Sequence, residues 1–191
     1  GPTGPAGSSW YLASAGGSDD FFTGLLDDVH TYDGVLTDLQ VAYLYANPGN
    51  VTVACKNPES YCSAASNSVS AQGSGIGWIG TPSVWGEDFT LFAHSVPTGQ
   101  FGIFYYGPNQ ISVPFGDGFR CVGAGLLGTF RLPVLQADSF GDVYCTIDFN
   151  APPANSGLGQ MVDGMEWNFQ FWSRDPTGGE ATVNLSNSLR V

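Results

Sequence analysis

The stretch from residue 102 to residue 122, GIFYYGPNQISVPFGDGFRCV, constrains the fold of this chain more than any other. An aromatic run at residues 103–106 is followed by a Gly-Pro-Asn break and by a second apolar run at residues 111–115. A tight Gly116-Asp117-Gly118 turn then leads into Cys121. β-branched and aromatic runs that are cut by Gly, Pro and Asn are typical of antiparallel sheet. The stretch therefore predicts three successive strands at the centre of a β-rich domain.

Similar short segments recur through the chain after residue 50, separated by turn-forming sequences. Regular short strands with loops of a few residues are typical of a β-sandwich. Including the central stretch, strands are expected at residues 68–74, 89–95, 100–106, 110–115, 120–122, 128–135, 143–148, 166–173 and 181–191. The predicted fold class is all-β, an antiparallel and jelly-roll-like β-sandwich with one short helix near residues 37–46.

The helix is predicted from its end signals. Thr37 and Gln40 have the spacing of a capping box, in which the two side chains bond to backbone N–H groups of the first turn. Asn47-Pro48-Gly49 follows the last apolar position and should end the helix.

Composition excludes several classes of partner. The 191 residues include 17 acidic and five basic side chains, which gives a formal net charge of −12. Such a charge repels nucleic acid and anionic lipid surfaces, so we expect neither as a partner. No apolar run is long enough to cross a membrane, so we expect no membrane insertion. The acidity fits a soluble extracellular protein, or one that binds divalent cations.

Four cysteines, Cys55, Cys62, Cys121 and Cys145, lack the paired short spacings of a zinc site. An even number of cysteines with scarce lysine predicts two disulfides and an extracellular or cell-surface location. Three connectivities are possible. We favour Cys62–Cys121 with Cys55–Cys145, which would tie the start of the second domain to its interior.

Residues 1–49 form the first predicted domain. They contain an ordered series of Phe22, Gly24, Leu26, Asp27, Asp28, Val29, Tyr32, Asp33, Leu36 and Thr37. This series resembles the last strands of laminin-G-like and concanavalin-like jelly rolls, so we expect the C-terminal portion of such a jelly roll here. In that family the residue matching Asp27 can ligate a structural calcium, and the resemblance implies the same role for Asp27. A calcium site needs six to eight oxygen ligands, and the others would come from the part of the jelly roll that precedes this sequence.

Residues 50–191 form the second predicted domain. Its motifs are Tyr61-Cys62, VPTGQFGIFYYG at 96–107, PFGDGFRCVG at 114–123, FQFWSRDP at 169–176 and NLSNSL at 184–189. Together they resemble a C-terminal β-sandwich domain of large secreted proteins of environmental bacteria, which often follows laminin-G-like modules. The resemblance brings no catalytic activity and implies an accessory, adhesive or assembly role.

No catalytic constellation is recognisable, so we do not expect an enzyme. His30 and His94 are the two histidines, and the sequence has no G-x-S-x-G, no H-E-x-x-H, no P-loop and no dinucleotide fingerprint. The E-x-D-x-x-E pattern of jelly-roll glycosidases, which supplies their paired carboxylates, is also absent.

Aromatic side chains are the remaining functional signal, because exposed aromatic rings can stack on sugar rings. Alternation along the strand at residues 166–173 places Gln170 and Trp172 on the same face, opposite the core. Trp78 and Trp85 flank a Gly-, Pro- and Ser-rich loop where aromatic rings are expected to be exposed. We therefore predict Trp78, Trp85, Trp172 and Gln170 as ligand-binding residues, with a polysaccharide or surface glycan as the ligand.

These observations leave two hypotheses. The first is a non-catalytic extracellular module for surface attachment or carbohydrate binding. The alternative is a structural subunit of an extracellular appendage or filament, in which neighbouring subunits of the same protein pair with an open strand edge of the incomplete jelly roll. Specific sugar binding favours the first hypothesis, and concentration-dependent polymers favour the second.

Overall fold

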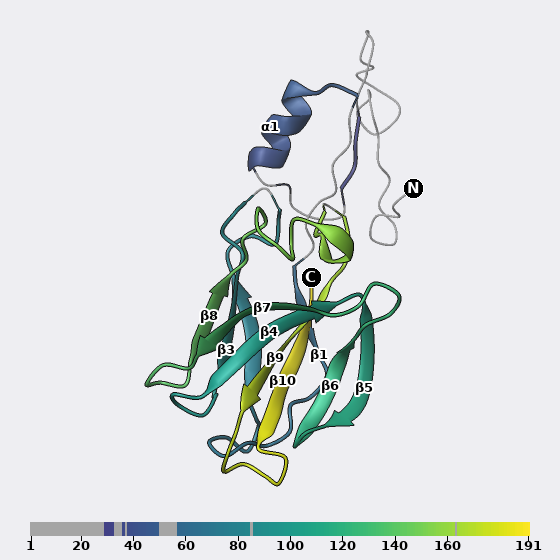
Figure 1. Ribbon diagram of the computed structural model, residues 1–191. Helices are drawn as coiled ribbons and strands as arrows, with labels where there is room; N and C mark the ends of the chain where they lie inside the picture. The colour runs from purple at the N-terminus through teal and green to yellow at the C-terminus, as the bar shows by residue number, and fades with distance from the viewer. Residues whose placement is uncertain (1–28, 33–35, 37, 50–56, 85, 163) are drawn as a thin grey trace, which may run out of the picture. The chain divides into compact units, whose positions relative to one another are not determined.

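The computed structural model describes residues 29–32, 36, 38–49, 57–84, 86–162 and 164–191 (Figure 1). The chain divides into two compact units, residues 1–54 and residues 55–191. The first unit contains helix α1 (Asp38–Ala46). The backbone N–H and the side-chain amide of Asn47 both donate to the Tyr43 carbonyl, at 3.0 and 2.8 Å, and so close the last turn of the helix. The expected short helix is therefore present, and its predicted cap Thr37 lies outside the described residues.

The second unit contains ten strands and one 3-10 turn in its described part. These elements are β1 (Glu59–Tyr61), β2 (Gly75–Ile79), β3 (Thr90–His94), β4 (Phe101–Gly107), β5 (Asn109–Phe115), β6 (Gly118–Gly123), β7 (Phe130–Gln136), β8 (Val143–Thr146), the 3-10 turn η1 (Gly157–Gly159), β9 (Asn168–Arg174) and β10 (Val183–Arg190).

The strands form three antiparallel sheets. A five-stranded sheet has the order β1-β10-β9-β4-β7, and a three-stranded sheet has the order β2-β3-β8. These two sheets pack face to face, with β2 beside β10 and β8 beside β7. The third sheet is the β5–β6 hairpin, which lies against β10 and β9 (Figure 1). The predicted all-β antiparallel sandwich is confirmed.

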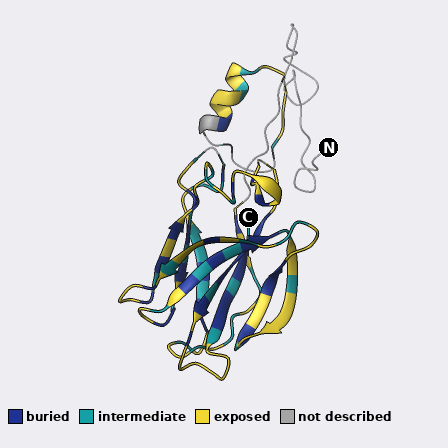
Figure 2. Ribbon diagram, in the orientation of Figure 1, coloured by how far each residue is buried: buried dark blue, intermediate teal, exposed yellow. Residues whose placement is uncertain are grey.

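The core lies between the five-stranded and three-stranded sheets. Alternate side chains of the central strands β4 and β9 point into it, so Phe104 packs on Phe171 with ring centroids 4.6 Å apart and Tyr106 meets Trp167 at 5.0 Å. Leu91 of β3 is fully buried from the other side. Figure 2 shows buried positions along β9 and β10 and mostly exposed positions along β5. Both faces of β9 are therefore covered, one by the core and one by the hairpin.

The central stretch forms three strands, as predicted, but they do not lie in one sheet. β4 pairs with β9 and β7, whereas β5 and β6 pair with each other. The chain turns away at Gly107, where a Cβ would lie 2.5 Å from the carbonyl oxygen of Gly123. Only glycine permits this close approach, which lets the hairpin cross back over the outer face of the five-stranded sheet, the face away from the core.

Two local predictions were wrong. Residues 68–74 form a turn and not a strand, because the Asn67 side chain accepts the N–H groups of Val69 and Ser70 at 3.0 and 2.7 Å. The neighbouring strand β2 occupies part of the expected loop at residues 77–86. The short strand β1 was not predicted. Short, Gly-containing strands carry little periodic signal of their own.

One of the two favoured disulfides is present. Cys62, just after β1, is bonded to Cys121 of β6. Cys145 of β8 is an unpaired, buried thiol, so its predicted bond to Cys55 is not formed in this structure, and Cys55 itself lies outside the described residues. Burial raises the pKa of the Cys145 thiol to about 11.

Among the described helices, none is long and apolar enough to span a bilayer.

Candidate functional site

The three described residues among the four predicted to bind ligand do not meet in one site. Trp78 lies on β2 and packs, partly buried, against the core. Gln170 is fully buried beneath the hairpin. Trp85 lies outside the described residues. Trp172 borders a cavity, and it is half-buried there.

Gln170 is a structural residue and is not available to a ligand. Its Nε2 donates to the carbonyls of Phe119 and Ser186, both at 2.8 Å, and its Oε1 accepts the Cys121 N–H at 2.9 Å and the Tyr105 hydroxyl at 2.5 Å. These four bonds use both donors and both acceptor positions of the amide. The prediction that Gln170 contacts a ligand is therefore wrong, because the hairpin covers the sheet face that alternation alone leaves open.

The bonds of Gln170 also explain how the hairpin is held. β10 bulges between Leu185 and Ser188, and β5 bulges opposite Cys121, so each ladder loses pairing at these points. The Gln170 amide bonds to a backbone group at each bulge, the Ser186 carbonyl and the Cys121 N–H. One buried side chain thus joins two sheets at their irregular positions.

A cavity of about 380 Å³ lies between the hairpin and the outer face of the five-stranded sheet. Sheet register places Leu185, Trp172 and Ile103 side by side on β10, β9 and β4, and they form its floor together with Tyr105. The rim consists of Phe115 and Arg120 from the hairpin and of Thr129 and Arg131 at the start of β7. We call it the Trp172 cavity.

Two arginines dominate the electrostatics of the Trp172 cavity. Arg131 stands directly opposite Tyr105 in the β4–β7 register. Burial raises the pKa of the Tyr105 hydroxyl, and the positive charge of Arg120, which lines the same cavity, opposes this rise. Among the described residues, no carboxylate lines the cavity, and neither Arg120 nor Arg131 forms an ion pair.

The Trp172 cavity combines an apolar surface with hydrogen-bond donors. The indole offers a flat apolar face, and the guanidinium groups offer hydrogen-bond donors in a planar fork. The Tyr105 hydroxyl stays protonated at neutral pH and already donates to Gln170. The described side chains around the cavity include no carboxylate, imidazole or thiol to serve as an acid, a base or a nucleophile.

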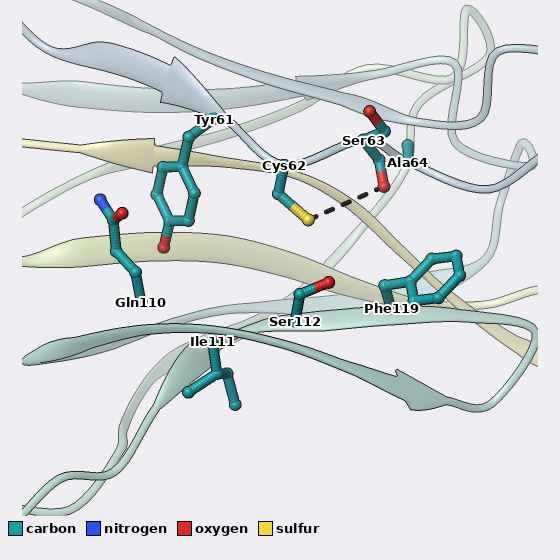
Figure 3. Close-up of a pocket in the computed structure, with 8 residues that line it drawn as sticks. All are labelled: Tyr61, Cys62, Ser63, Ala64, Gln110, Ile111, Ser112 and Phe119. Carbon is teal, nitrogen blue, oxygen red and sulfur yellow. Dashed lines mark hydrogen bonds between the residues drawn. The ribbon is translucent and has the colours of Figure 1, made fainter.

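A second hollow of about 450 Å³ lies between the end of β1 and the hairpin (Figure 3). Residues 61–64 line one side and the hairpin lines the other. The Tyr61 hydroxyl donates to the Cys121 carbonyl at 3.1 Å, and the Gln110 amide donates to Asn168 at 3.1 Å. The described part of its lining contains no charged side chain, and two of its polar groups are engaged in holding the hairpin, so it offers a ligand less than the Trp172 cavity does.

The outer face of the three-stranded sheet carries a row of aromatic rings that sequence reasoning missed. The Phe92 ring lies 6.3 Å from His94 and 6.2 Å from Tyr144, centroid to centroid, and Tyr144 is 55% exposed. Phe92 lies over Gly77, whose Cβ would be 2.5 Å from the ring. The feature that could have predicted this row is the pairing of glycines on β2 with aromatic residues on β3. This pairing can be recognised only when the strand register is known.

Asp27, which was predicted to ligate calcium, lies outside the described residues. Across the part of the chain that the structure does describe, no group of three or more His, Cys, Asp or Glu side chains is placed to hold a metal ion.

The chain matches no family model, no curated protein and no solved structure. The function is therefore argued from the geometry of the Trp172 cavity.

Proposed function

We propose that the sandwich unit is a non-catalytic extracellular module that attaches to a surface by binding carbohydrate in the Trp172 cavity. The observation that carries the proposal is the half-buried indole of Trp172 on the floor of a 380 Å³ cavity whose rim holds hydrogen-bond donors. Sugar rings have apolar C–H faces that stack on aromatic rings and hydroxyl groups that accept hydrogen bonds. A concave site with an apolar floor and a few polar groups at its rim suits such a ligand.

The disulfide supports an extracellular location. Cys62–Cys121 ties the hairpin to the segment after β1, and bonds of this kind persist in oxidising compartments. The same bond helps to hold the hairpin over the sheet, and the Trp172 cavity exists because the hairpin is there.

A glycan array tests the proposal with the full chain and two variants. We expect specific binding by the wild type and at least about a ten-fold loss of affinity for Trp172→Ala, since a buried aromatic anchor is the usual centre of binding energy. Tyr144→Ala is the matched control, because it removes an exposed aromatic ring from the other sheet. Thermal unfolding of each variant checks that it is folded.

Three results would contradict the proposal. Unchanged binding by Trp172→Ala would remove the Trp172 cavity from consideration. Loss of binding by Tyr144→Ala instead would move the site to the aromatic row on the three-stranded sheet. Absence of binding to every glycan would overturn the carbohydrate-binding function itself.

The filament alternative has less support. Strand addition needs an open sheet edge. The end strands β7 and β5 carry Pro133 and Pro114, each of which removes a backbone donor, whereas the end strands β1, β2 and β8 carry no proline. The filament hypothesis places the open strand edge in the incomplete jelly roll, at residues 8–46. Most of these residues lie outside the described part of the chain. Light scattering and negative-stain microscopy, with and without a calcium chelator, distinguish the two functions. Ordered polymers would favour the filament, and their loss with chelator would support the calcium site predicted at Asp27.

A further inference from the structure

We propose that the ligand of the Trp172 cavity is an acidic sugar, whose carboxylate or sulfate group is held by Arg120 and Arg131 while its ring rests on Trp172. The inference rests on the proposed function and narrows the class of carbohydrate.

The distribution of charge is the first observation. The chain has five basic residues against 17 acidic ones, yet two of the five line this one cavity and none of the described acidic residues does. The positive charge of Arg190, in contrast, is balanced by acidic side chains. Arg190 pairs with Glu59 and lies 3.8 Å from Glu166. Arg120 and Arg131 have no such partner among the described residues, which leaves two guanidinium charges for an anion.

Both arginines line the same cavity as Tyr105. Arg131 is the cross-strand neighbour of Tyr105, and the charge of Arg120 acts on the hydroxyl of the same tyrosine. The Tyr105 hydroxyl donates to Gln170 and has no proton left for a ligand. An anionic group above Tyr105 would therefore be bound by the arginines, which present planar, paired donors to carboxylate and sulfate oxygens.

The net charge of the protein indicates how densely charged the ligand can be. At physiological ionic strength the effect of a charge is screened over about 8 Å. The electrostatic potential inside the cavity is therefore set mainly by the two arginines that line it. The surrounding charge of −12 still repels a densely charged polymer as it approaches. The fitting ligand is a polysaccharide with isolated acidic residues, and nucleic acid is disfavoured.

Calorimetric titration with matched oligosaccharides tests the inference. The probes carry one acidic group each: hexagalacturonate methyl-esterified at all but one residue, compared with the fully esterified hexasaccharide, and a singly sulfated dextran oligosaccharide, compared with the unsulfated one. We expect an acidic probe to bind at least about ten-fold more tightly than its neutral match, as charged hydrogen bonds commonly provide. The pair that shows the difference identifies the acidic group.

Variants locate the effect. Arg120→Gln and Arg131→Gln should each weaken binding of the acidic probe by about ten-fold and weaken any binding of the neutral probe by less, because a neutral sugar loses a hydrogen bond but no charge interaction. Arg174→Gln is the control, since Arg174 is exposed at the end of β9, lies outside the cavity and changes the net charge equally. Arg131→Lys keeps the charge without the planar fork and should fall between wild type and Arg131→Gln. All these positions are exposed, so the variants should fold, and thermal unfolding checks this.

The outcomes separate this inference from the proposed function. Equal binding of acidic and neutral probes, or a preference that survives both Gln variants, overturns the inference and leaves carbohydrate binding in place. If no oligosaccharide of either kind binds, the proposed function is overturned and the inference falls with it.

Discussion

Replacing Gln170 by leucine should release the β5–β6 hairpin from the five-stranded sheet. The side chain is fully buried, and its amide bonds to four groups. Leucine has a similar volume and fills the same space, but it provides no donor or acceptor. The substitution therefore isolates the contribution of the hydrogen bonds from that of packing.

The size of the effect follows from which partners lose contact with water. The bonds to the Cys121 N–H and the Ser186 carbonyl are buried, whereas those to Phe119 and Tyr105 are part-buried and their partners can reach solvent. A buried polar group left without a partner costs about 1–3 kcal/mol. Two such groups lower the free energy of unfolding by about 2–6 kcal/mol, which places Gln170→Leu among the most destabilising single substitutions.

Urea denaturation of the oxidised protein, followed by tryptophan fluorescence and near-ultraviolet circular dichroism, measures this change. Gln110→Leu is the matched control, because it makes the same substitution on the exposed side of the hairpin and removes one bond to Asn168. We expect the control to change the free energy of unfolding by about 1 kcal/mol or less. If the two variants are equally stable, the reasoning about Gln170 is refuted.

Gln170→Glu adds a test with a definite pH dependence. The new carboxyl would face the carbonyls of Phe119 and Ser186, which accept hydrogen bonds and do not donate them, so it must remain protonated in the folded state. Its folded-state pKa is thus raised above the unfolded value of about 4.3. Stability relative to wild type should be highest at pH 4 and below and should fall as the pH rises above that value. A pH-independent difference would contradict the assigned bonds.

Two further predictions concern the cysteines. Because the bond between Cys62 and Cys121 closes a loop with a sequence separation of 59 residues, Cys62→Ser with Cys121→Ser should lower the free energy of unfolding by about 4 kcal/mol, and unchanged urea midpoints would contradict this. In a Cys55→Ser background, the Cys145 thiol should not react with a thiol reagent at pH 8 until urea is added, because burial raises its pKa to about 11 and keeps it protonated. Rapid labelling of the folded protein would show that the thiol is accessible.

Local patterns in the sequence were sufficient for the fold class and for most of the strands. Alternating apolar residues and the turn-forming sequences between them act over a few residues, so β3–β10 all lie within a few residues of their predicted positions. Asn47 and its neighbours ended the helix as predicted, for the same local reason. The predictions were wrong at residues 68–74 and missed β1 and β2, where short, Gly-containing or polar segments take their structure from distant partners.

The candidate site depended on contacts that local patterns do not contain. Alternation correctly placed Gln170 and Trp172 on the same face of β9, but it could not show that the hairpin would bury one and leave the other half-exposed. Arg120 and Arg131 belong to different sheets, and neither was singled out in the sequence. They border one cavity because the chain turns back at Gly107 and the strand register sets Arg131 beside Tyr105. The sequence by itself determined which residues form strands, because strand formation depends on near neighbours. The tertiary structure alone decided what covers each sheet face, because this depends on where the hairpin crosses the five-stranded sheet and on the register between strands that are distant in the sequence.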